Sequence, residues 1–131
     1  MSELDIRKWL SNITETVKEK DLDKHMDLVS EKVMVYGMPS GKTLSYTDWQ
    51  NRRKSEFKRD LIKDLSYSEL QIKNFGLRRL IFSIQEMMDG TNGDLAIIDK
   101  QVVLEQEEDN QWRVVEETIN NWNFVKGRRT S

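Results

Sequence analysis

The sequence predicts an α+β fold in which three N-terminal helices pack against an antiparallel β-sheet. Two observations predict it. Up to Asp64, apolar residues recur at steps of three and four with charged residues between them, which is typical of amphipathic helices. Beyond Asp64 the pattern changes to strand-like runs separated by turn residues. Helices followed by strands form an α+β order, and the helices are expected to cover one face of the sheet.

The first helix is indicated by an apolar stripe made of Ile6, Trp9, Leu10, Ile13 and Val17. Ser2 is a candidate N-cap for this helix. A short second helix is predicted to start at Asp21. One of its faces carries Leu22, Met26 and Val29. The segment "KVMVYG" then has the character of a strand, and "MPSGK" has that of a turn.

A third helix is predicted to start after Ser45, which is a suitable N-cap because Asp48 follows at the third helical position. Its apolar stripe consists of Tyr46, Trp49, Phe57 and Leu61.

Four strands are predicted beyond this helix, at residues 66–74, 79–88, 94–107 and 111–122. In the segment "DLAIIDKQVVLEQ", apolar residues occur at both odd-numbered and even-numbered positions, so both faces of the strand are apolar. In a sheet with one face in solvent, apolar and polar residues would alternate along the strand. Both faces are therefore expected to be covered, one by the helices and the other by a second copy of the chain. This pattern predicts a homodimer through the outer sheet face.

Size and composition exclude several classes of function. The chain of 131 residues is expected to form a single domain, residues 1–131, with a frayed basic tail at 126–131. The net charge is only -2, so neither a nucleic-acid partner nor a membrane surface is expected. There is no signal-peptide core, so the default expectation is a cytoplasmic protein. With no cysteine and a single histidine, no metal site and no cofactor are expected.

Four segments, taken in order, carry a family resemblance. They are the helix with Trp9, then "KDLDKHMDLVSEKVMVYG", "YTDWQNRR" and "LEQEEDNQWRVVEE", and they span about residues 5 to 120. Together they resemble the nuclear-transport-factor-2-like superfamily, in its SnoaL-like branch. The resemblance implies a cystatin-like cone: a strongly curved antiparallel sheet wrapped around three helices, with an internal pocket. Members often dimerise through the outer sheet face, in agreement with the two-sided strands.

The ketosteroid isomerases of this superfamily use an aspartate base at the end of the first strand and a tyrosine on the first helix. Aligning Asp21, Leu22 and Asp23 without a gap puts the base at Gly37 and the tyrosine near Ile13. Neither residue can transfer a proton, so that activity is not expected. The scytalone-dehydratase type of site depends on histidines, and this chain has one.

Arg53 is the most informative polar residue of the third helix. It lies four residues after Trp49 and four before Phe57, so it is expected to face the sheet. A buried guanidinium needs a partner. That partner is either an acid, for which Asp99, Glu116 or Glu117 could serve, or the anion of a ligand.

Three other residues are weak candidates for acid–base chemistry: Asp99, Tyr36 and His25. Asp99 shares its parity with Leu95, Ile97 and Val103, and it is the expected inward acid of the sheet. Glu116 and Glu117 alternate, so only one of them is expected to point inward. His25 borders the apolar face of the second helix, as a base at the pocket rim or as a packed structural histidine.

The resulting functional hypothesis is a small-molecule-binding domain with a mostly apolar pocket, for a small hydrophobic or carboxylate ligand anchored by an inward arginine. The predicted ligand-binding residues are Trp9, Tyr36, Trp49, Arg53, Phe57, Met87 and Trp122. One alternative is a SnoaL-like isomerase, cyclase or hydro-lyase that acts on a hydrophobic substrate. A second alternative is a protein-interaction module.

Overall fold

The structure is a computed structural model that describes residues 3–127. Within this range the helices are α1 (Glu3–Glu19), α2 (Leu22–Met26) and α3 (Tyr46–Lys58). The strands are β1 (Val29–Tyr36), β2 (Ile62–Phe75), β3 (Arg79–Gly90), β4 (Leu95–Gln106) and β5 (Trp112–Val125). The order confirms the predicted α+β class. The proposed cap at Ser2 and the tail residues 128–131 lie outside the described range.

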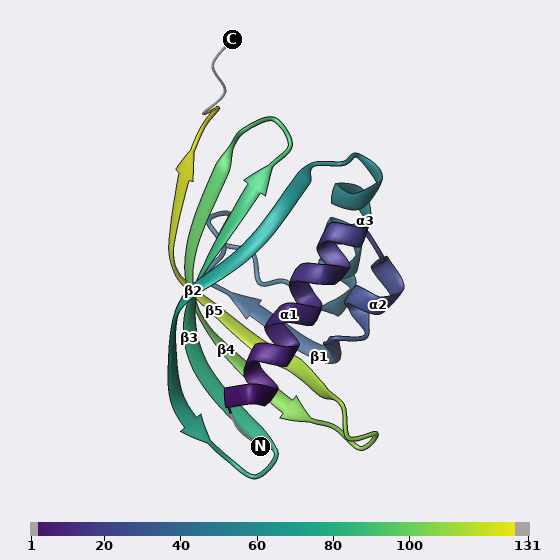
Figure 1. Cartoon of the computed structure of the whole chain (residues 1–131), viewed down its shortest axis with the longest axis vertical. Helices are drawn as coiled ribbons and strands as arrows, with labels where there is room; N and C mark the ends of the chain where they lie inside the picture. Colours follow the sequence, from purple (N-terminus) through teal and green to yellow (C-terminus); the bar gives the residue numbers. More distant parts are fainter. Residues whose placement is uncertain (1–2, 128–131) are drawn as a thin grey trace.

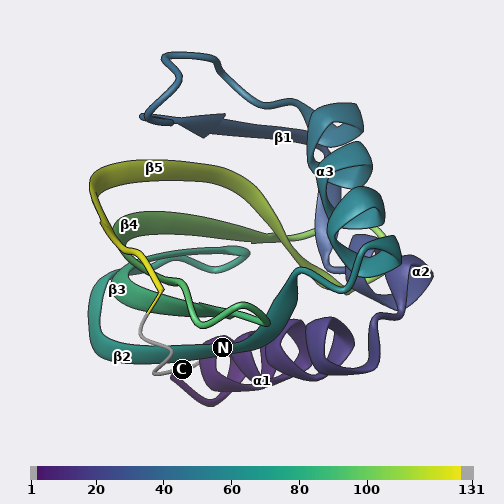
Figure 2. The same cartoon turned by 90° about the horizontal axis from the view of Figure 1, so that it is seen from above.

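The five strands form one open sheet in the order β1-β5-β4-β3-β2. The sheet is mixed rather than wholly antiparallel, because β1 runs parallel to β5. The four later strands, β2 to β5, follow one another as antiparallel neighbours, and β1 joins the sheet beside the last of them. Figure 1 shows the helices on one face of the sheet and none on the other. Figure 2 shows α1 lying beside β2 and α3 lying beside β1.

The helices form where the periodicity predicts them. All five stripe residues of α1 are buried, and they join a single core with the inner face of the sheet. The predicted capping box of α3 is confirmed, because the Ser45 side chain accepts from the backbone N–H of Asp48 while the Asp48 carboxylate accepts from that of Ser45. A helix with these caps begins at a defined residue, and this sets the direction of the side chains that follow.

Several boundaries differ from the prediction. β2 begins at Ile62 and not at residue 66, and β5 ends at Val125 and not at residue 122. Val29 is not part of α2 but the first residue of β1, because α2 ends after five residues. Leu61 lies beyond α3 and is 40% exposed, so it does not belong to the apolar stripe. The buried stripe of α3 is instead Trp49, Arg53 and Phe57.

Two irregularities in β5 decide which of its residues face the helices. The register with β4 shifts between Asp99 and Lys100 and again between Val103 and Leu104. At each shift β5 contains one extra residue, Asn120 or Val115, as in a β-bulge. Each extra residue reverses the alternation. As a result the inner face of β5 carries Val114, Glu117, Ile119 and Trp122.

No helix of the described residues is long and apolar enough to span a membrane.

Candidate functional site

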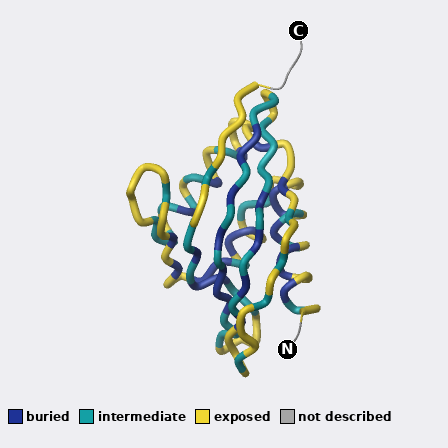
Figure 3. The backbone as a smooth tube through the Cα atoms, turned by 90° about the vertical axis from the view of Figure 1, so that its left-hand side faces the viewer, coloured by how far each residue is buried: buried dark blue, intermediate teal, exposed yellow. Residues whose placement is uncertain are grey.

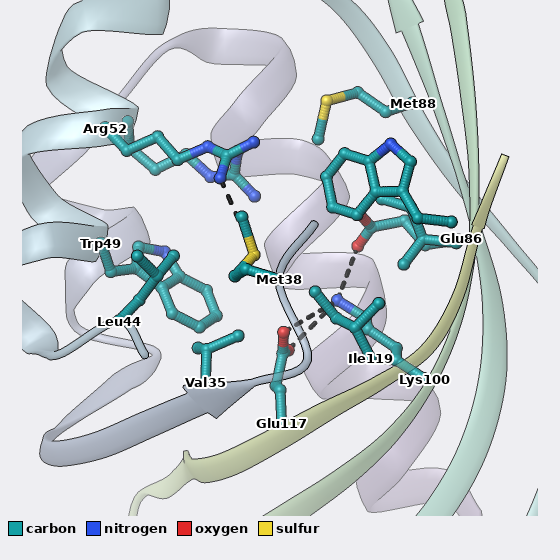
Figure 4. Close-up of a pocket in the computed structure, with 13 residues that line it drawn as sticks. Val35, Met38, Leu44, Trp49, Arg52, Glu86, Met88, Lys100, Glu117 and Ile119 are labelled. Atoms are coloured by element: carbon teal, nitrogen blue, oxygen red, sulfur yellow. Dashed lines mark hydrogen bonds and ion pairs between the residues drawn. The ribbon is translucent and has the colours of Figure 1, made fainter. Parts of the chain in front are cut away.

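A pocket lies between α3 and the inner face of the sheet (Figure 4). Its cavity measures about 50 Å³. Apolar side chains make up most of its wall, namely Val35, Met38, Leu44, Trp49, Met88, Ile98, Ile119 and Trp122. The polar residues of the wall are Arg52, Arg53, Glu86, Lys100 and Glu117. The site is therefore an apolar hollow with a concentrated polar group, which is the usual composition of a small-molecule site.

The polar group is centred on Lys100, which lies on β4 between Glu86 of β3 and Glu117 of β5. The Lys100 ammonium donates to Glu86 Oε1 at 2.9 Å and to Glu117 Oε1 and Oε2 at 3.1 and 3.2 Å. The Tyr67 hydroxyl donates to the same Glu86 oxygen at 2.9 Å. All three charged residues are less than 10% exposed. Two buried carboxylates therefore share one buried ammonium.

The pKa values of the two carboxylates of this group are shifted in opposite directions. Burial opposes the charged form of Glu86, but Lys100 and Arg53, together with the hydrogen bonds from Lys100 and Tyr67, hold the pKa of Glu86 below its ordinary value. For Glu117, burial raises the pKa above its ordinary value, and Lys100 offsets this only in part while Glu86 adds to it. Burial also opposes the charge of Lys100, but Glu117 and Glu86 hold its pKa above the ordinary value.

Arg53 is 9% exposed and reaches the pocket from α3. Its Nη1 donates to Glu56 Oε1 at 2.8 Å, and its Nε donates to His25 Nε2 at 3.2 Å. The prediction that Asp99, Glu116 or Glu117 pairs with Arg53 is wrong. Glu56, which lies one turn further along the same helix, is the acid that contacts the guanidinium. A guanidinium has five N–H donors. Two of them are used within the described residues, where the other three make no hydrogen bond, and the guanidinium carbon lies 6.0 Å from the centre of the Trp49 ring.

His25 is fully buried behind the pocket and does not line it. Thr16 Oγ1 donates to the Ile13 carbonyl, so it accepts from His25 Nδ1 at 3.1 Å. His25 Nε2 in turn accepts from Trp49 Nε1 and Arg53 Nε, both at 3.2 Å. Burial, followed by the charges of Arg53 and Lys100, lowers the pKa of His25 to about 2. His25 is therefore a neutral structural residue that holds two pocket side chains in place.

The mouth of the pocket is covered by three side chains. The Arg52 guanidinium carbon lies 5.9 Å from the centre of the Trp122 ring, a cation–π distance. Arg52 Nη1 also lies 4.0 Å from the Met38 sulfur (Figure 4). None of these contacts is a strong hydrogen bond. Arg52 Nε also lies 3.6 Å from Glu56 Oε2, and a partly exposed pair of this kind contributes at most about 1 kcal/mol, so the cover can rearrange at low cost.

The structure separates the predicted ligand-binding residues into three groups. Trp49, Arg53 and Trp122 line the pocket. Trp9 and Phe57 are core residues: the Trp9 indole donates to the Leu28 carbonyl, and the Phe57 ring packs against His25. Trp9 lies on α1, and Phe57 lies two turns beyond Trp49 on α3, so both pack into the core and neither lines the cavity.

Tyr36, Met87 and Asp99 lie on the outer face of the sheet. Met87 pairs with Ile97, and the side chain of Asp99 accepts from Gln85. The expectation that Asp99 is the inward acid is wrong, because the row that faces the helices has the other parity: Ala96, Ile98, Lys100, Val102 and Leu104. Both rows of β4 are apolar, so parity did not distinguish them.

Glu86 and Lys100 are pocket residues that the sequence analysis does not predict, although the strand pattern contains a signal for each. Glu86 continues the inward row of Leu80, Phe82 and Ile84, and Lys100 interrupts the row of Ile98 and Val102. A charged residue at an inward position of a strand needs a partner, and the two rows are neighbours in the sheet.

Gly37 follows β1 at a close approach of two backbones. Its φ is +82°, and a Cβ atom at this position would lie 2.2 Å from the carbonyl oxygen of Ile119. The position that aligns with the aspartate base of the ketosteroid isomerases therefore has no room for any side chain.

We expect Gly37→Ala to lower the free energy of unfolding by about 2 kcal/mol more than Gly41→Ala does. Gly41 is the matched control because its φ is +79° but nothing lies within 4 Å of its Cβ position. Both variants suffer the same backbone strain, and only the first also displaces β5. Urea denaturation of the two variants measures the difference, and equal losses would show that the contact is relieved without cost.

A curved sheet that carries three helices on one face, with a pocket between them, defines the class of α+β cone proteins. No protein-family model matches the chain, and neither does any curated protein. Solved structures do match it. An NTF2-like protein of unknown function from Shewanella oneidensis aligns with a TM-score of 0.75 at 16% identity, over 91% of this chain and 98% of that one.

An NTF2-like protein from Cytophaga hutchinsonii aligns with a TM-score of 0.72 at 14% identity, over 91% of this chain and 98% of that one. A protein from Novosphingobium aromaticivorans, which its name assigns provisionally to the scytalone dehydratases, aligns with a TM-score of 0.71 at 9% identity. That alignment covers 96% of this chain and 87% of the other. The chain therefore has the NTF2-like fold, and the resemblance is confirmed at that level. At such identities the likeness concerns the fold and not the activity.

Proposed function

We propose that this protein binds a small molecule with an apolar body and a polar head group, and that Arg53 is the anchor of the head group. The observation that carries the proposal is a buried guanidinium that reaches an apolar cavity with three N–H donors unused by the described residues. The guanidinium nitrogens of Arg53 are not among the buried atoms that lack a partner in the described part of the chain, so the unused donors remain accessible. A ligand that accepts from these donors would form charge-assisted hydrogen bonds with them.

The free cavity is small for such a ligand. A volume of about 50 Å³ holds only a few water molecules. Binding therefore requires the cover of Arg52, Met38 and Trp122 to move. Methionine side chains adapt readily to new shapes, and Met38 and Met88 flank the space that would open. We expect affinity for several related shapes and not for one alone.

We expect Arg53→Met to weaken the binding of hydrophobic carboxylates about tenfold to about a hundredfold, because a hydrogen bond to a charged group contributes about 1.5–3 kcal/mol. Methionine keeps the apolar stem and removes the donors. The measurement is the ligand-induced shift in Tm across a panel of aromatic and aliphatic acids and their amides. Arg59→Met is the matched control, since Arg59 is an exposed residue at the end of α3. If no acid or amide stabilises the wild type, the proposal loses its support.

The alternative of an isomerase, cyclase or hydro-lyase rested on Asp99, Tyr36 and His25. All three lie outside this pocket, two on the outer face and one in the core. We do not propose catalysis by these residues.

We also propose that the outer face of the sheet binds a second copy of the chain. No helix within residues 3–127 covers this face, and its central strands carry the apolar side chains of Ile81, Met87, Ile97 and Val103. Figure 3 looks onto it, with exposed residues at the margins and less exposed residues along the central strands.

Light scattering at micromolar concentration is expected to give twice the mass of one chain. We expect Ile97→Lys to shift the protein to monomers, because the charge would be buried without a partner. Asp23→Lys on the exposed side of α2 is the control and should leave the dimer intact. A monomeric wild type would contradict this proposal while leaving the pocket proposal untouched.

A further inference from the structure

Glu117 is the less stabilised of the two carboxylates that share Lys100. Glu86 accepts from both Lys100 and Tyr67, whereas Glu117 accepts from Lys100 alone among the described residues. Glu117 is 4% exposed and forms part of the pocket wall. Of the two acids, it is the one that can take up a proton without leaving a second donor unpaired.

The charges around the pocket set a condition on an anionic ligand. The positive groups are Arg52, Arg53 and Lys100, and the negative groups are Glu56, Glu86 and Glu117. With all six ionised the set is neutral, and an added anion would be unbalanced in a buried site. When Glu117 carries a proton, the set has one excess positive charge. A single anionic head group then restores neutrality.

We propose that the ligand is an anion, of the carboxylate class, and that Glu117 holds a proton while it is bound. This inference rests on the proposed function of the pocket. The head group lies between Arg53 and Lys100, where the unused guanidinium donors and the ammonium meet the cavity. The protonated Glu117 then donates its O–H to the ligand, and the ionised form would repel the same oxygen.

The groups that face Glu117 are consistent with this role. From β4 it meets Lys100, from β3 Glu86, and from α3 Arg53. Tyr67 of β2 acts on it through Glu86, and on β1 its neighbour is the apolar Val35. Burial and Glu86 both raise the pKa of Glu117 above its ordinary value, whereas Lys100 and Arg53 act in the opposite direction.

Binding and proton uptake then form one equilibrium. Above the pKa of Glu117 in the free protein, each bound anion takes one proton from the solvent, which protonates one carboxylate oxygen. The same proton returns to the solvent when the ligand leaves. Affinity is therefore full at low pH and falls about tenfold for each pH unit above that pKa.

The test uses benzoate as the anionic probe and benzamide as its neutral counterpart. Isothermal titration calorimetry between about pH 5 and about pH 8.5, in two buffers of different protonation enthalpy, gives the affinity and the number of protons taken up. Three proteins are compared: the wild type, Glu117→Gln and Glu116→Gln. Glutamine imitates the protonated acid, and Glu116 is the matched control because it faces outward beside Val103. Circular dichroism first confirms that each variant is folded.

We expect benzoate affinity to fall with rising pH and with proton uptake in the wild type and in Glu116→Gln, and to be independent of pH in Glu117→Gln. Benzamide should bind all three without pH dependence. If benzamide binds but benzoate fails to bind even Glu117→Gln, the anion inference is overturned and the pocket proposal stands. If benzoate binds the wild type without pH dependence and without proton uptake, the proposed role of Glu117 is overturned and the pocket proposal stands. If neither probe binds any of the three proteins, the pocket proposal itself fails and this inference falls with it.

Discussion

Replacing Lys100 with methionine is expected to lower the free energy of unfolding by about 3–5 kcal/mol, the largest effect among our predictions. Lys100 is 8% exposed and is the only ammonium that both Glu86 and Glu117 contact among the described residues. Methionine is similar in length, so packing is largely kept. What is lost is the positive charge that makes two buried carboxylates tolerable.

Urea denaturation measures this effect, with Lys32→Met as the matched control. Lys32 contacts Glu105 at 2.9 Å, but its side chain is 64% exposed, and a surface pair of this kind contributes at most about 1 kcal/mol. Adding Glu117→Gln to Lys100→Met should recover part of the loss, because one of the two stranded charges is then removed. If Lys100→Met and Lys32→Met lower the free energy of unfolding by similar amounts, the buried ion pairs of Lys100 stabilise the fold no more than a surface pair does.

The pH dependence of Lys100→Met has a definite sign. Without the ammonium, the pKa values of the buried carboxylates rise above their values in the unfolded chain. The contribution of these carboxylates to the stability of the variant is then greatest below the unfolded pKa of glutamic acid, and it is lost as the pH rises through their folded pKa values. We therefore expect the deficit relative to the wild type to shrink in acid.

The second large effect is loss of stability in acid through His25. Its pKa is lowered to about 2 in the folded protein, first by burial and then by Arg53 and Lys100, against about 6.5 in an unfolded chain. The unfolded chain therefore binds the proton more readily than the folded one. Stability from this group is complete above about pH 6.5 and falls by about 1.4 kcal/mol for each unit below it. Two pH units thus remove about 3 kcal/mol.

Comparison with His25→Asn isolates this contribution, because asparagine does not titrate. We expect the variant to be less stable at neutral pH, since Trp49, Arg53 and Thr16 lose their partner. Between about pH 6.5 and about pH 4 its stability should fall less steeply than that of the wild type. The free energy of unfolding at a series of pH values measures both curves. Parallel curves would mean that His25 becomes protonated in the folded state.

Most of the fold could be predicted from the sequence, because it depends on local patterns. The stripe of Ile6, Trp9, Leu10, Ile13 and Val17 and the capping box of Ser45 and Asp48 are formed by neighbours in the chain. The succession of helices and strands then follows from periodicity. Arg53 was identified in the same way, because its position between Trp49 and Phe57 follows from helical geometry alone.

The site could be predicted only in part, because the faces of the sheet depend on pairing. Both rows of β4 are apolar, so the sequence did not show that Lys100 faces inward and Asp99 outward. Two bulges in β5 reverse the alternation of inward and outward side chains, and no local sequence pattern predicts these bulges. The partner of Arg53 was also not predicted. Glu56 lies three residues further along the same helix and pairs with the guanidinium, whereas the expected acids of the sheet do not.

The sequence by itself determined the class of fold, the place of the helices and an arginine on the face of α3 that meets the sheet. Helical and strand periods are properties of a few consecutive residues, so they can be recognised without knowing how the rest of the chain folds. Only the tertiary structure decided that Glu86, Lys100 and Glu117 meet at the pocket and that His25 does not. These residues come from three strands and a helix, and their neighbours are set by strand register and the helix packed upon it.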